Sequence, residues 1–437
     1  MKNRFFKYVS QNILAMIGLS LYILADTYFI SKAVGANGIT ALNMALPVYG
    51  VIFALGQMVG VGSAIRYSIV KEQYRNSNKD GSNECDKYFA GALFWGLVIG
   101  VIFAVLGLVF PDKIVEIMGG DETIVAIGVP YFRIFMSFSP FFIFNYTCNA
   151  FVRNDGNPSV SMAATLISSL FDYILMFPLG MGMPGAALAT ALSPVVGVMI
   201  CMIHFLSKKN TVKFKWFKIS LTRLFHCCQV GMSAFVGEMS GAVIVMVFNF
   251  IILRLTGNIG VAAYGVVANT ALVAVAVFNG VALGSQPLIS ESYGKHNIKD
   301  IKLIEKLGVA TALGLAVIIV IMIWGFTDTI VGVFNSQGSD RLLSLARVGL
   351  RIYFIGFLFA GINIFCSSAL SAIASVKWAF VLSILKGFVV VNVCAAILAP
   401  IFGMNGVWVA FPLSEFILLI ISGVAMKKSI GALESER

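Results

Sequence analysis

The feature that most constrains this chain is a succession of long apolar stretches, broken only by short polar turns and clusters of basic residues. A helix needs about 20 apolar residues to cross the hydrocarbon core of a bilayer, and twelve stretches reach roughly that length. Their approximate limits are 9–31, 38–70, 88–110, 124–152, 159–179, 185–206, 223–255, 261–292, 305–326, 341–371, 376–399 and 405–426. The sequence therefore predicts an all-α integral membrane protein with twelve transmembrane helices.

The composition and the placement of charge favour the same class. Of the 437 residues, 59% are hydrophobic and 12% are charged, whereas a soluble domain carries about 25% charged residues. The net charge of +11 comes from Lys and Arg gathered between the apolar stretches. Loops beside anionic lipid have this pattern, so we expect the lipid bilayer as a partner and no nucleic acid.

The distribution of Lys and Arg predicts the orientation. With the N-terminus inside, the inside loops and ends hold 23 of these residues and the outside loops hold 4. Inside loops of membrane proteins are enriched in basic residues, so both termini are predicted to be cytoplasmic, in a multi-pass protein of the plasma (inner) membrane. No small-residue cleavage site follows the basic start at Lys2, Arg4 and Lys7, which favours a retained first helix over a signal peptide.

The two halves of the chain repeat each other at an offset of 218 to 222 residues. The matching pairs are Gly35 and Gly38 with Gly257 and Gly260, Gly62-Ser63 with Gly284-Ser285, Arg133 and Asn145 with Arg351 and Asn363, and Gly182 and Gly185 with Gly403 and Gly406. Each half has six helices, an even number, so both halves enter the membrane from the same side. The prediction is two six-helix lobes, 1–206 and 223–437, related by a parallel pseudo-two-fold repeat and joined by a cytoplasmic linker, 207–222.

Two carboxylates lie inside the apolar stretches of the N-terminal half. A charge at the bilayer centre costs about 2.5–3.5 kcal/mol on insertion scales, so each needs a reason. Asp26 and Asp172 lie about 5 and 7 residues from the outer ends of their helices, hence at similar depth. Thr190 falls near the same level, and Ser168 precedes Asp172 by one helical turn on the same face. These four residues form the predicted ion-coupling site. The structural alternatives are an Asp26 that reaches interfacial water and an Asp172 that makes a buried hydrogen bond.

The C-terminal half is predicted to have its own buried charges within the stretches, namely Glu238, Lys386 and Glu415. Lys386 and Glu415 each lie about 10 residues into antiparallel neighbouring helices, which places both near the membrane midplane. A structural ion pair between them is one interpretation. The other is a second ion or substrate site formed with Glu238.

Catalytic and metal-binding patterns are not recognisable in the sequence. The seven cysteines show no C-x-x-C spacing, and the three histidines are not paired at ligand spacing. No G-x-S-x-G turn or comparable catalytic motif occurs either. We therefore predict a protein that is not an enzyme and has neither a cofactor nor a bound metal.

Three short motifs carry a resemblance to a known family. They are Asp26-Thr-Tyr-Phe-Ile30 followed by Gly35-x-x-Gly38, then Arg153-x-Asp-Gly156-x-Pro158, and Gly284-Ser-Gln-Pro287-x-x-x-Glu291-x-x-Gly294. Together with the twelve helices in two lobes, they make the chain resemble the multidrug and toxic compound extrusion (MATE) family. The resemblance implies an antiporter whose cleft between the lobes opens alternately to the two sides of the membrane.

In similar bacterial members, a carboxylate on the first helix, one on the fifth and a hydroxyl on the sixth bind the coupling ion. Asp26, Asp172 and Thr190 match those positions. Two departures matter. Ser168 stands where the family has Asn, which leaves open whether the ion is H⁺ or Na⁺, and Gln11 stands near the place of a first-helix Pro that permits bending in some members. Glu238 falls where some members carry a seventh-helix acid.

The resulting prediction is a secondary active efflux transporter that exports amphipathic, cationic, drug-like compounds by proton- or sodium-coupled antiport. We expect it to function as a monomer. A flippase for lipid-linked oligosaccharides, from the same superfamily, is the alternative. A groove lined by several basic residues would favour the flippase, and only a few cations lie within the predicted spans.

Overall fold

The structure is a computed structural model of the whole chain. It describes the backbone of residues 1–77, 82–118, 122–176, 182–208, 210–215, 217, 219–334 and 339–435. Within those ranges the side chains of 21–44, 82, 123, 124, 127, 168–176 and 182–186 are not described.

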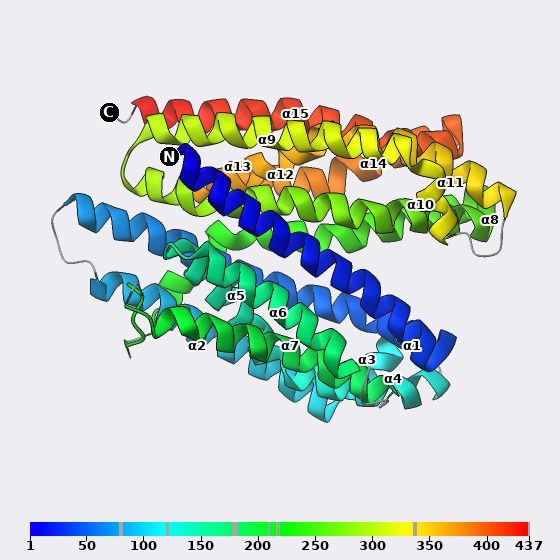
Figure 1. The fold of residues 1–437 in the computed structure, drawn as a ribbon, viewed down its shortest axis with the longest axis horizontal. Helices are drawn as coiled ribbons and strands as arrows, with labels where there is room; N and C mark the ends of the chain where they lie inside the picture. The colour runs from blue at the N-terminus through cyan, green and yellow to red at the C-terminus, as the bar shows by residue number, and fades with distance from the viewer. Residues whose placement is uncertain are drawn as a thin grey trace. The chain divides into compact units, whose positions relative to one another are not determined.

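All elements of the described residues are helical (Figure 1). In the first half they are α1 (Lys2–Asn76), α2 (Ser82–Val109), α3 (Pro111–Ile117), α4 (Glu122–Ser137), α5 (Ser139–Asn154), α6 (Pro158–Met176) and α7 (Gly182–Phe205). In the second half they are α8 (Leu221–Gly294), α9 (Ile298–Gly325), α10 (Thr327–Phe334), α11 (Asp340–Tyr353), η1 (Phe354–Gly356), α12 (Phe357–Ala372), α13 (Val376–Ile384), η2 (Leu385–Val389), α14 (Val390–Phe402) and α15 (Met404–Ser435).

The predicted stretches fall within these helices, with two differences. Some neighbouring stretches belong to one helix, and two stretches are divided by a break. The residues of the first two predicted helices fall in α1, and those of the seventh and eighth fall in α8. Within α8, Gly257 has φ 68° and ψ −158°, outside the helical region, and marks the junction. The fourth predicted helix is divided at Phe138 into α4 and α5. The tenth is divided by η1 at the matching place, so the repeat extends to the breaks.

The chain forms two compact units. One consists of Met1–Ile13, Val236–Ser292 and Asn297–Arg437, and the other of Leu14–Phe235 and Tyr293–His296. These units differ from the predicted lobes because the first 13 residues pack with the C-terminal half. Likewise, the first residues of α8 pack with the N-terminal half. We call the unit that contains Asn297–Arg437 the C-terminal unit, and the unit that contains Leu14–Phe235 the N-terminal unit.

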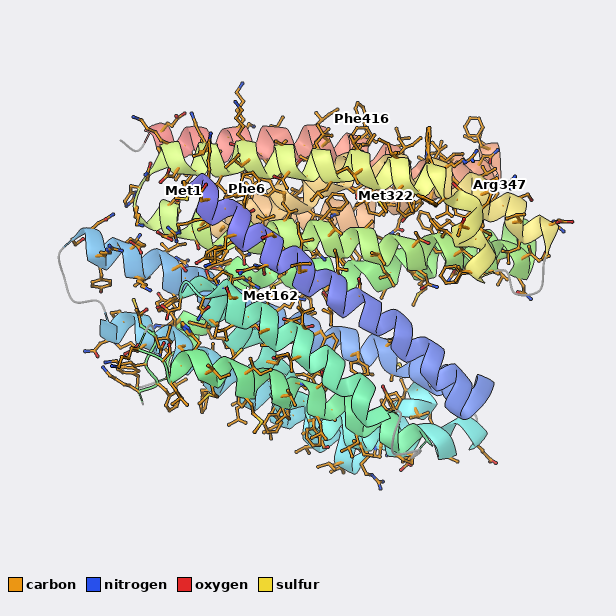
Figure 2. The ribbon with its side chains drawn as sticks, viewed as in Figure 1. Met1, Phe6, Met162, Met322, Arg347 and Phe416 are labelled. Atoms are coloured by element: carbon orange, nitrogen blue, oxygen red, sulfur yellow. The ribbon has the colours of Figure 1, made fainter. Side chains whose placement is uncertain are left out.

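Large apolar side chains face outward along several helices, as expected of a protein in lipid. Met322 on α9 and Phe416 on α15 are both exposed (Figure 2). Eight helices among the described residues are long and apolar enough to span a membrane. The buried positions, in contrast, include many polar groups, among them Asn363, Glu415 and Asp155. A membrane protein shows this arrangement because lipid is as apolar as the side chains it touches, while polar groups need partners inside the protein.

Candidate functional site

Three of the four residues of the predicted ion-coupling site, Asp26, Asp172 and Ser168, have side chains outside the described residues. The fourth, Thr190, is half-buried on α7. Helix α7 packs against α6, the helix that carries Asp172. The coupling site therefore stays a prediction.

Lys386 lies in η2, the π-helical turn between α13 and α14. π-helical turns are rare and frequently occur at functional sites. A Cβ added at the next residue, Gly387, would lie 2.1 Å from the Cβ of Ser240, so α8 passes close to the turn. Glu238, two residues before Ser240, is exposed. The C-terminal unit thus brings the Lys386 turn and the Glu238 segment of α8 together.

Glu415 is fixed by an amide rather than by a direct ion pair. Asn363 Nδ2 on α12 donates to Glu415 Oε2 at 2.7 Å and to the Glu415 backbone carbonyl at 2.9 Å. Ser422 Oγ donates to Asn363 Oδ1 at 2.8 Å, which orients the amide. Lys386 interacts with Glu415 electrostatically, but no nitrogen–oxygen contact within 4.0 Å joins these two described residues. The structure thus shows no direct contact between Lys386 and Glu415, and Asn363 donates the hydrogen bonds to the buried carboxylate.

The N-terminal unit contains a polar network centred on Asp155, the residue that follows α5. Asp155 Oδ1 accepts hydrogen bonds from Tyr67 Oη at 2.8 Å, Lys71 Nζ at 2.8 Å and the Thr211 hydroxyl. Its Oδ2 is 2.9 Å from His204 Nε2 and accepts from the Thr211 backbone N–H at 2.9 Å. One carboxylate thereby joins α1, α5 and α7 to the segment that follows α7.

The electrostatics of this network stabilise the ionised carboxylate. Burial by itself would raise the pKa of Asp155, but the hydrogen bond from His204 and the charge of Lys71 outweigh it and hold the pKa well below its usual range. Asp155 is thus a charged group that anchors the predicted linker to the helices. In the sequence, Asp155 is part of the Arg153-x-Asp-Gly156-x-Pro158 motif, which by itself does not indicate this role. Its place in that motif was the available signal.

The glycine anchors of the repeat mark two close helix contacts, one in each unit. In the C-terminal unit, a Cβ on Gly284 would lie 2.7 Å from Val9 Cα, so the start of α1 packs directly on α8. In the N-terminal unit, a Cβ on Gly62 would lie 2.1 Å from the Cys227 carbonyl oxygen, so the start of α8 packs directly on α1. The two contacts are repeats of each other. Only glycine permits such an approach of two backbones.

The third motif supplies an ion pair beside the first of these contacts. Arg4 Nη2 lies 2.7 Å from Glu291 Oε2, and Arg4 Nη1 donates to Glu291 Oε1 at 3.2 Å. Hydrogen bonding to Glu291 raises the pKa of the Arg4 guanidinium above its usual range. Gly284 and Glu291 of the motif therefore both hold the first turns of α1 to the C-terminal unit.

These observations define a class of protein: a multi-pass helical membrane protein made of two repeats, with buried polar groups and conserved geometry between the halves. Among the described residues, no three His, Cys, Asp or Glu side chains gather as a metal site would require. Comparison with known proteins narrows the class. The sequence pattern of the MatE family matches residues 12–178 and 234–401. The chain belongs to this family.

Relatives of known name support the assignment. The multidrug export protein MepA of Staphylococcus aureus (strain MRSA252) is 27% identical over 410 residues, which cover 90% of this chain and 86% of MepA. MepA of Staphylococcus saprophyticus is 24% identical over 400 residues, which cover 89% of this chain and 85% of that MepA.

Solved structures share the fold over nearly the full length. A MATE transporter in complex with MaL6 superposes with a TM-score of 0.93 at 21% identity and covers 99% of this chain and 97% of its own. An outward-facing MATE multidrug resistance transporter of the MOP superfamily superposes with a TM-score of 0.92 at 20% identity. The match covers 99% of this chain and 96% of that transporter. A MOP superfamily transporter from Pyrococcus furiosus superposes with a TM-score of 0.88 at 21% identity, and the match covers 98% of this chain and 96% of that transporter. That transporter is described by the reverse polarity of its binding pocket.

Proposed function

We propose that the protein is a secondary active multidrug efflux transporter, which exports amphipathic cationic compounds in exchange for inward-moving H⁺ or Na⁺. The observation that carries the proposal is the match of the MatE family to both halves of the chain, together with curated relatives that are multidrug export proteins. The transporter works by exposing its binding site alternately to the two sides of the membrane, because a coupled exchange requires two access states of one protein.

The proposed coupling site consists of Asp26, Asp172 and Thr190, with Ser168 as a supporting group. A carboxyl that is desolvated and close to a second carboxyl has its proton affinity raised, so it binds a proton or a sodium ion on one side and releases it on the other. The C-terminal half has Phe248 at the position of Asp26 and Val393 at that of Asp172. This asymmetry between the halves supports a coupling role, since a purely architectural pair would be expected in both repeats.

The polarity of the substrate rests on the charges of the C-terminal half. The carboxylates Glu238 and Glu415 within its spans can attract a cation. The basic residues within those spans, Lys386, Arg347 and Arg351, are too few to line a basic groove. The fold by itself does not fix substrate polarity, since a transporter of similar fold is described by a pocket of reverse polarity. The flippase alternative would need a basic groove. A comparison of cationic, neutral and anionic dyes in the same assay distinguishes these proposals.

The decisive experiment is dye efflux from proteoliposomes under an imposed proton gradient and, separately, under a sodium gradient. We expect one gradient to drive export of a cationic dye. Asp172→Asn and Asp26→Asn should each abolish gradient-driven export while dye binding in detergent is retained. The double variant should be no worse than either single variant, because the two carboxylates act as a unit.

Glu116→Gln is the matched control, since Glu116 is an exposed carboxylate on α3. This variant should transport normally. Full gradient-driven export by Asp172→Asn would overturn the coupling site, and Glu238 would then be the next residue to test. Export of the dye without any ion gradient would overturn coupled transport itself.

A further inference from the structure

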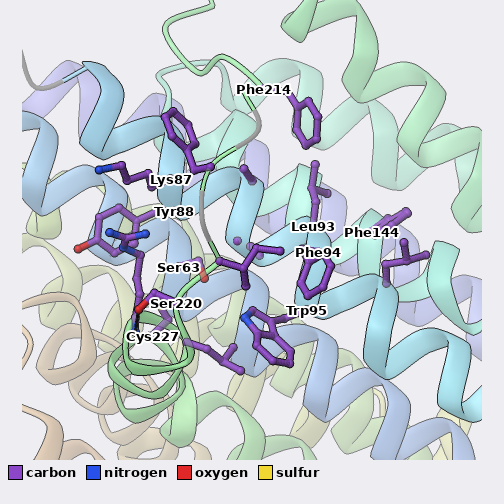
Figure 3. A pocket seen from close by; sticks show the side chains of 18 residues that line it. Ser63, Lys87, Tyr88, Leu93, Phe94, Trp95, Phe144, Phe214, Ser220 and Cys227 are labelled. Atoms are coloured by element: carbon purple, nitrogen blue, oxygen red, sulfur yellow. Dashed lines mark hydrogen bonds between the residues drawn. The ribbon is translucent and has the colours of Figure 1, made fainter.

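The N-terminal unit contains a cavity that the transport proposal does not use. It has a volume of about 280 Å³ and is lined mainly by α2, by residues 214, 217, 219 and 220 and by the first turns of α8 (Figure 3). Aromatic side chains dominate its wall, including Tyr88, Phe94, Trp95 and Phe217. At its margin Leu97 and Phe214 are 43% and 54% exposed. The cavity is therefore open to the surroundings of the unit along an apolar edge.

One end of the cavity is cationic. Lys87 and Arg223 both belong to its wall. Each lies over an aromatic ring, Lys87 Nζ 5.7 Å from the Phe217 centroid and Arg223 Cζ 5.6 Å from the Tyr88 centroid. The only carboxylate recorded with them among the described residues is Glu84, which pairs with Lys87 and lies 3.6 Å from Arg223. Two cations against one carboxylate leave an excess positive charge.

A third cation, Arg66, increases this excess. It follows Ser63 of the cavity wall by one helical turn and lies close enough to Tyr88 to interact with it electrostatically. Its Nε is buried and has no hydrogen-bond partner among the described residues. Because Glu84 pairs with both Lys87 and Arg223, an anionic group at this end of the cavity competes with that one carboxylate for three cations.

Deeper in the cavity stands a hydrogen-bond donor without an acceptor. Trp95 Nε1 is shielded from solvent and has no partner among the described residues. Trp95 and Ser63 both line the cavity, and in the view of Figure 3 the indole nitrogen is on the side of the ring toward Ser63. A buried N–H that stays unpaired costs free energy, so a ligand oxygen placed there would be favourable. Trp95 follows Lys87 by eight residues, about 12 Å along the helix, and its side chain leans back toward the helix N-terminus.

We propose that this cavity binds an anionic phospholipid, with the phosphodiester between Lys87 and Arg223, an ester carbonyl at Trp95 Nε1 and an acyl chain along the aromatic wall. A phospholipid presents an anion, ester acceptors and an apolar chain in that order, which is the order of the groups in the cavity. Lys87 and Arg223 fall on the predicted cytoplasmic side, where anionic lipid is concentrated. Tryptophan is typical of this membrane depth, because its ring is apolar and its N–H needs an acceptor.

The test uses full-length protein in nanodiscs and phosphatidylglycerol or phosphatidylcholine brominated in the acyl chains, which quenches nearby tryptophan fluorescence. The fluorescence of Trp95 is obtained as the difference between the wild type and Trp95→Phe. We expect brominated phosphatidylglycerol to quench it at a lower mole fraction than brominated phosphatidylcholine. Lys87→Gln with Arg223→Gln should weaken the phosphatidylglycerol effect about tenfold, from the loss of two cations near a lipid phosphate.

Two further variants make the result decisive. Glu84→Gln removes the competing carboxylate and should strengthen phosphatidylglycerol binding. Lys299→Gln with Lys377→Gln removes two exposed cations elsewhere and should leave quenching unchanged. Equal quenching by the two lipids, or equal behaviour of the two charge-removing pairs, would overturn the proposal. So would competition between brominated phosphatidylglycerol and a transported dye for Trp95, since the cavity would then be a substrate site. Loss of dye export in variants that retain lipid binding concerns the proposed function alone.

Discussion

At the scale of single residues, the carboxylates with partners are the points where the fold is most sensitive. Asp155 has a fully buried side chain that makes five hydrogen-bonding contacts to Tyr67, Lys71, His204 and the hydroxyl and N–H of Thr211. Asp155→Asn leaves Lys71 and His204 without their counter-charge. We expect a loss of about 3 kcal/mol in the free energy of unfolding, measured by denaturation in detergent. Lys71→Met should cost less, because Lys71 is partly exposed.

The pKa of Asp155 predicts how this loss depends on pH. Because its folded pKa is lowered, its stabilising effect is present above the unfolded pKa of about 4 and is lost as the pH falls toward the folded value. The difference in melting temperature between the wild type and Asp155→Asn should therefore be constant from pH 7 to about pH 5 and should shrink below about pH 4. A difference that stays constant down to pH 3 would contradict the low pKa.

The Glu415 network gives a second prediction at this scale. Asn363→Ala removes the amide that donates to the buried Glu415 carboxylate, and it should lower the free energy of unfolding by about 1–3 kcal/mol. Lys386→Met should cost less than Asn363→Ala, because Lys386 makes no direct contact with Glu415. Thermal unfolding of the two variants in one detergent checks the order. The reverse order would show that the ion pair, and not the amide, holds Glu415.

At the scale of elements, the first turns of α1 are held to α8 by backbone contact. Gly284→Ala would place a Cβ 2.7 Å from Val9 Cα, which forces the two helices apart and strains the Arg4–Glu291 ion pair. We expect a loss of about 1–3 kcal/mol in unfolding free energy. Gly423→Ala on α15 is the matched control, because nothing lies within 4 Å of its added Cβ. That variant should be neutral or slightly more stable, and equal losses in both would refute the contact.

At the scale of the whole molecule, the excess of basic residues in alternate loops predicts two cytoplasmic termini. A cysteine placed at Asn83 should react with a membrane-impermeant thiol reagent only after cells are opened, and a cysteine at Asn258 should react in intact cells. Both positions are exposed. Six of the seven native cysteines are buried and Cys228 is half-buried, so the unmodified protein is the control and should react little. Ready labelling of the residue-83 cysteine in intact cells would reverse the predicted orientation.

The sequence by itself determined the class of protein, the helices and the repeat. Apolar stretches of sufficient length leave the backbone no alternative to helices in lipid, where every N–H and C=O must be paired within its own segment. The glycine anchors of the repeat and the motif containing Asp155 were also visible, although their roles were not. The charges of Asp26, Asp172, Lys386 and Glu415 could be assigned a depth but no partners.

Only the tertiary structure decided the partners of Glu415 and Asp155, because partners come from residues far apart in the chain. Asn363 reaches Glu415 across 52 positions, and Lys71 reaches Asp155 across 84. The breaks at Phe138 and η1, the π-helical turn at Lys386 and the exchange of the first turns of α1 and α8 also depend on packing. Helical periodicity does not predict these breaks and contacts. An apolar stretch has the same sequence pattern whether its helix continues, kinks or packs against a glycine of another helix.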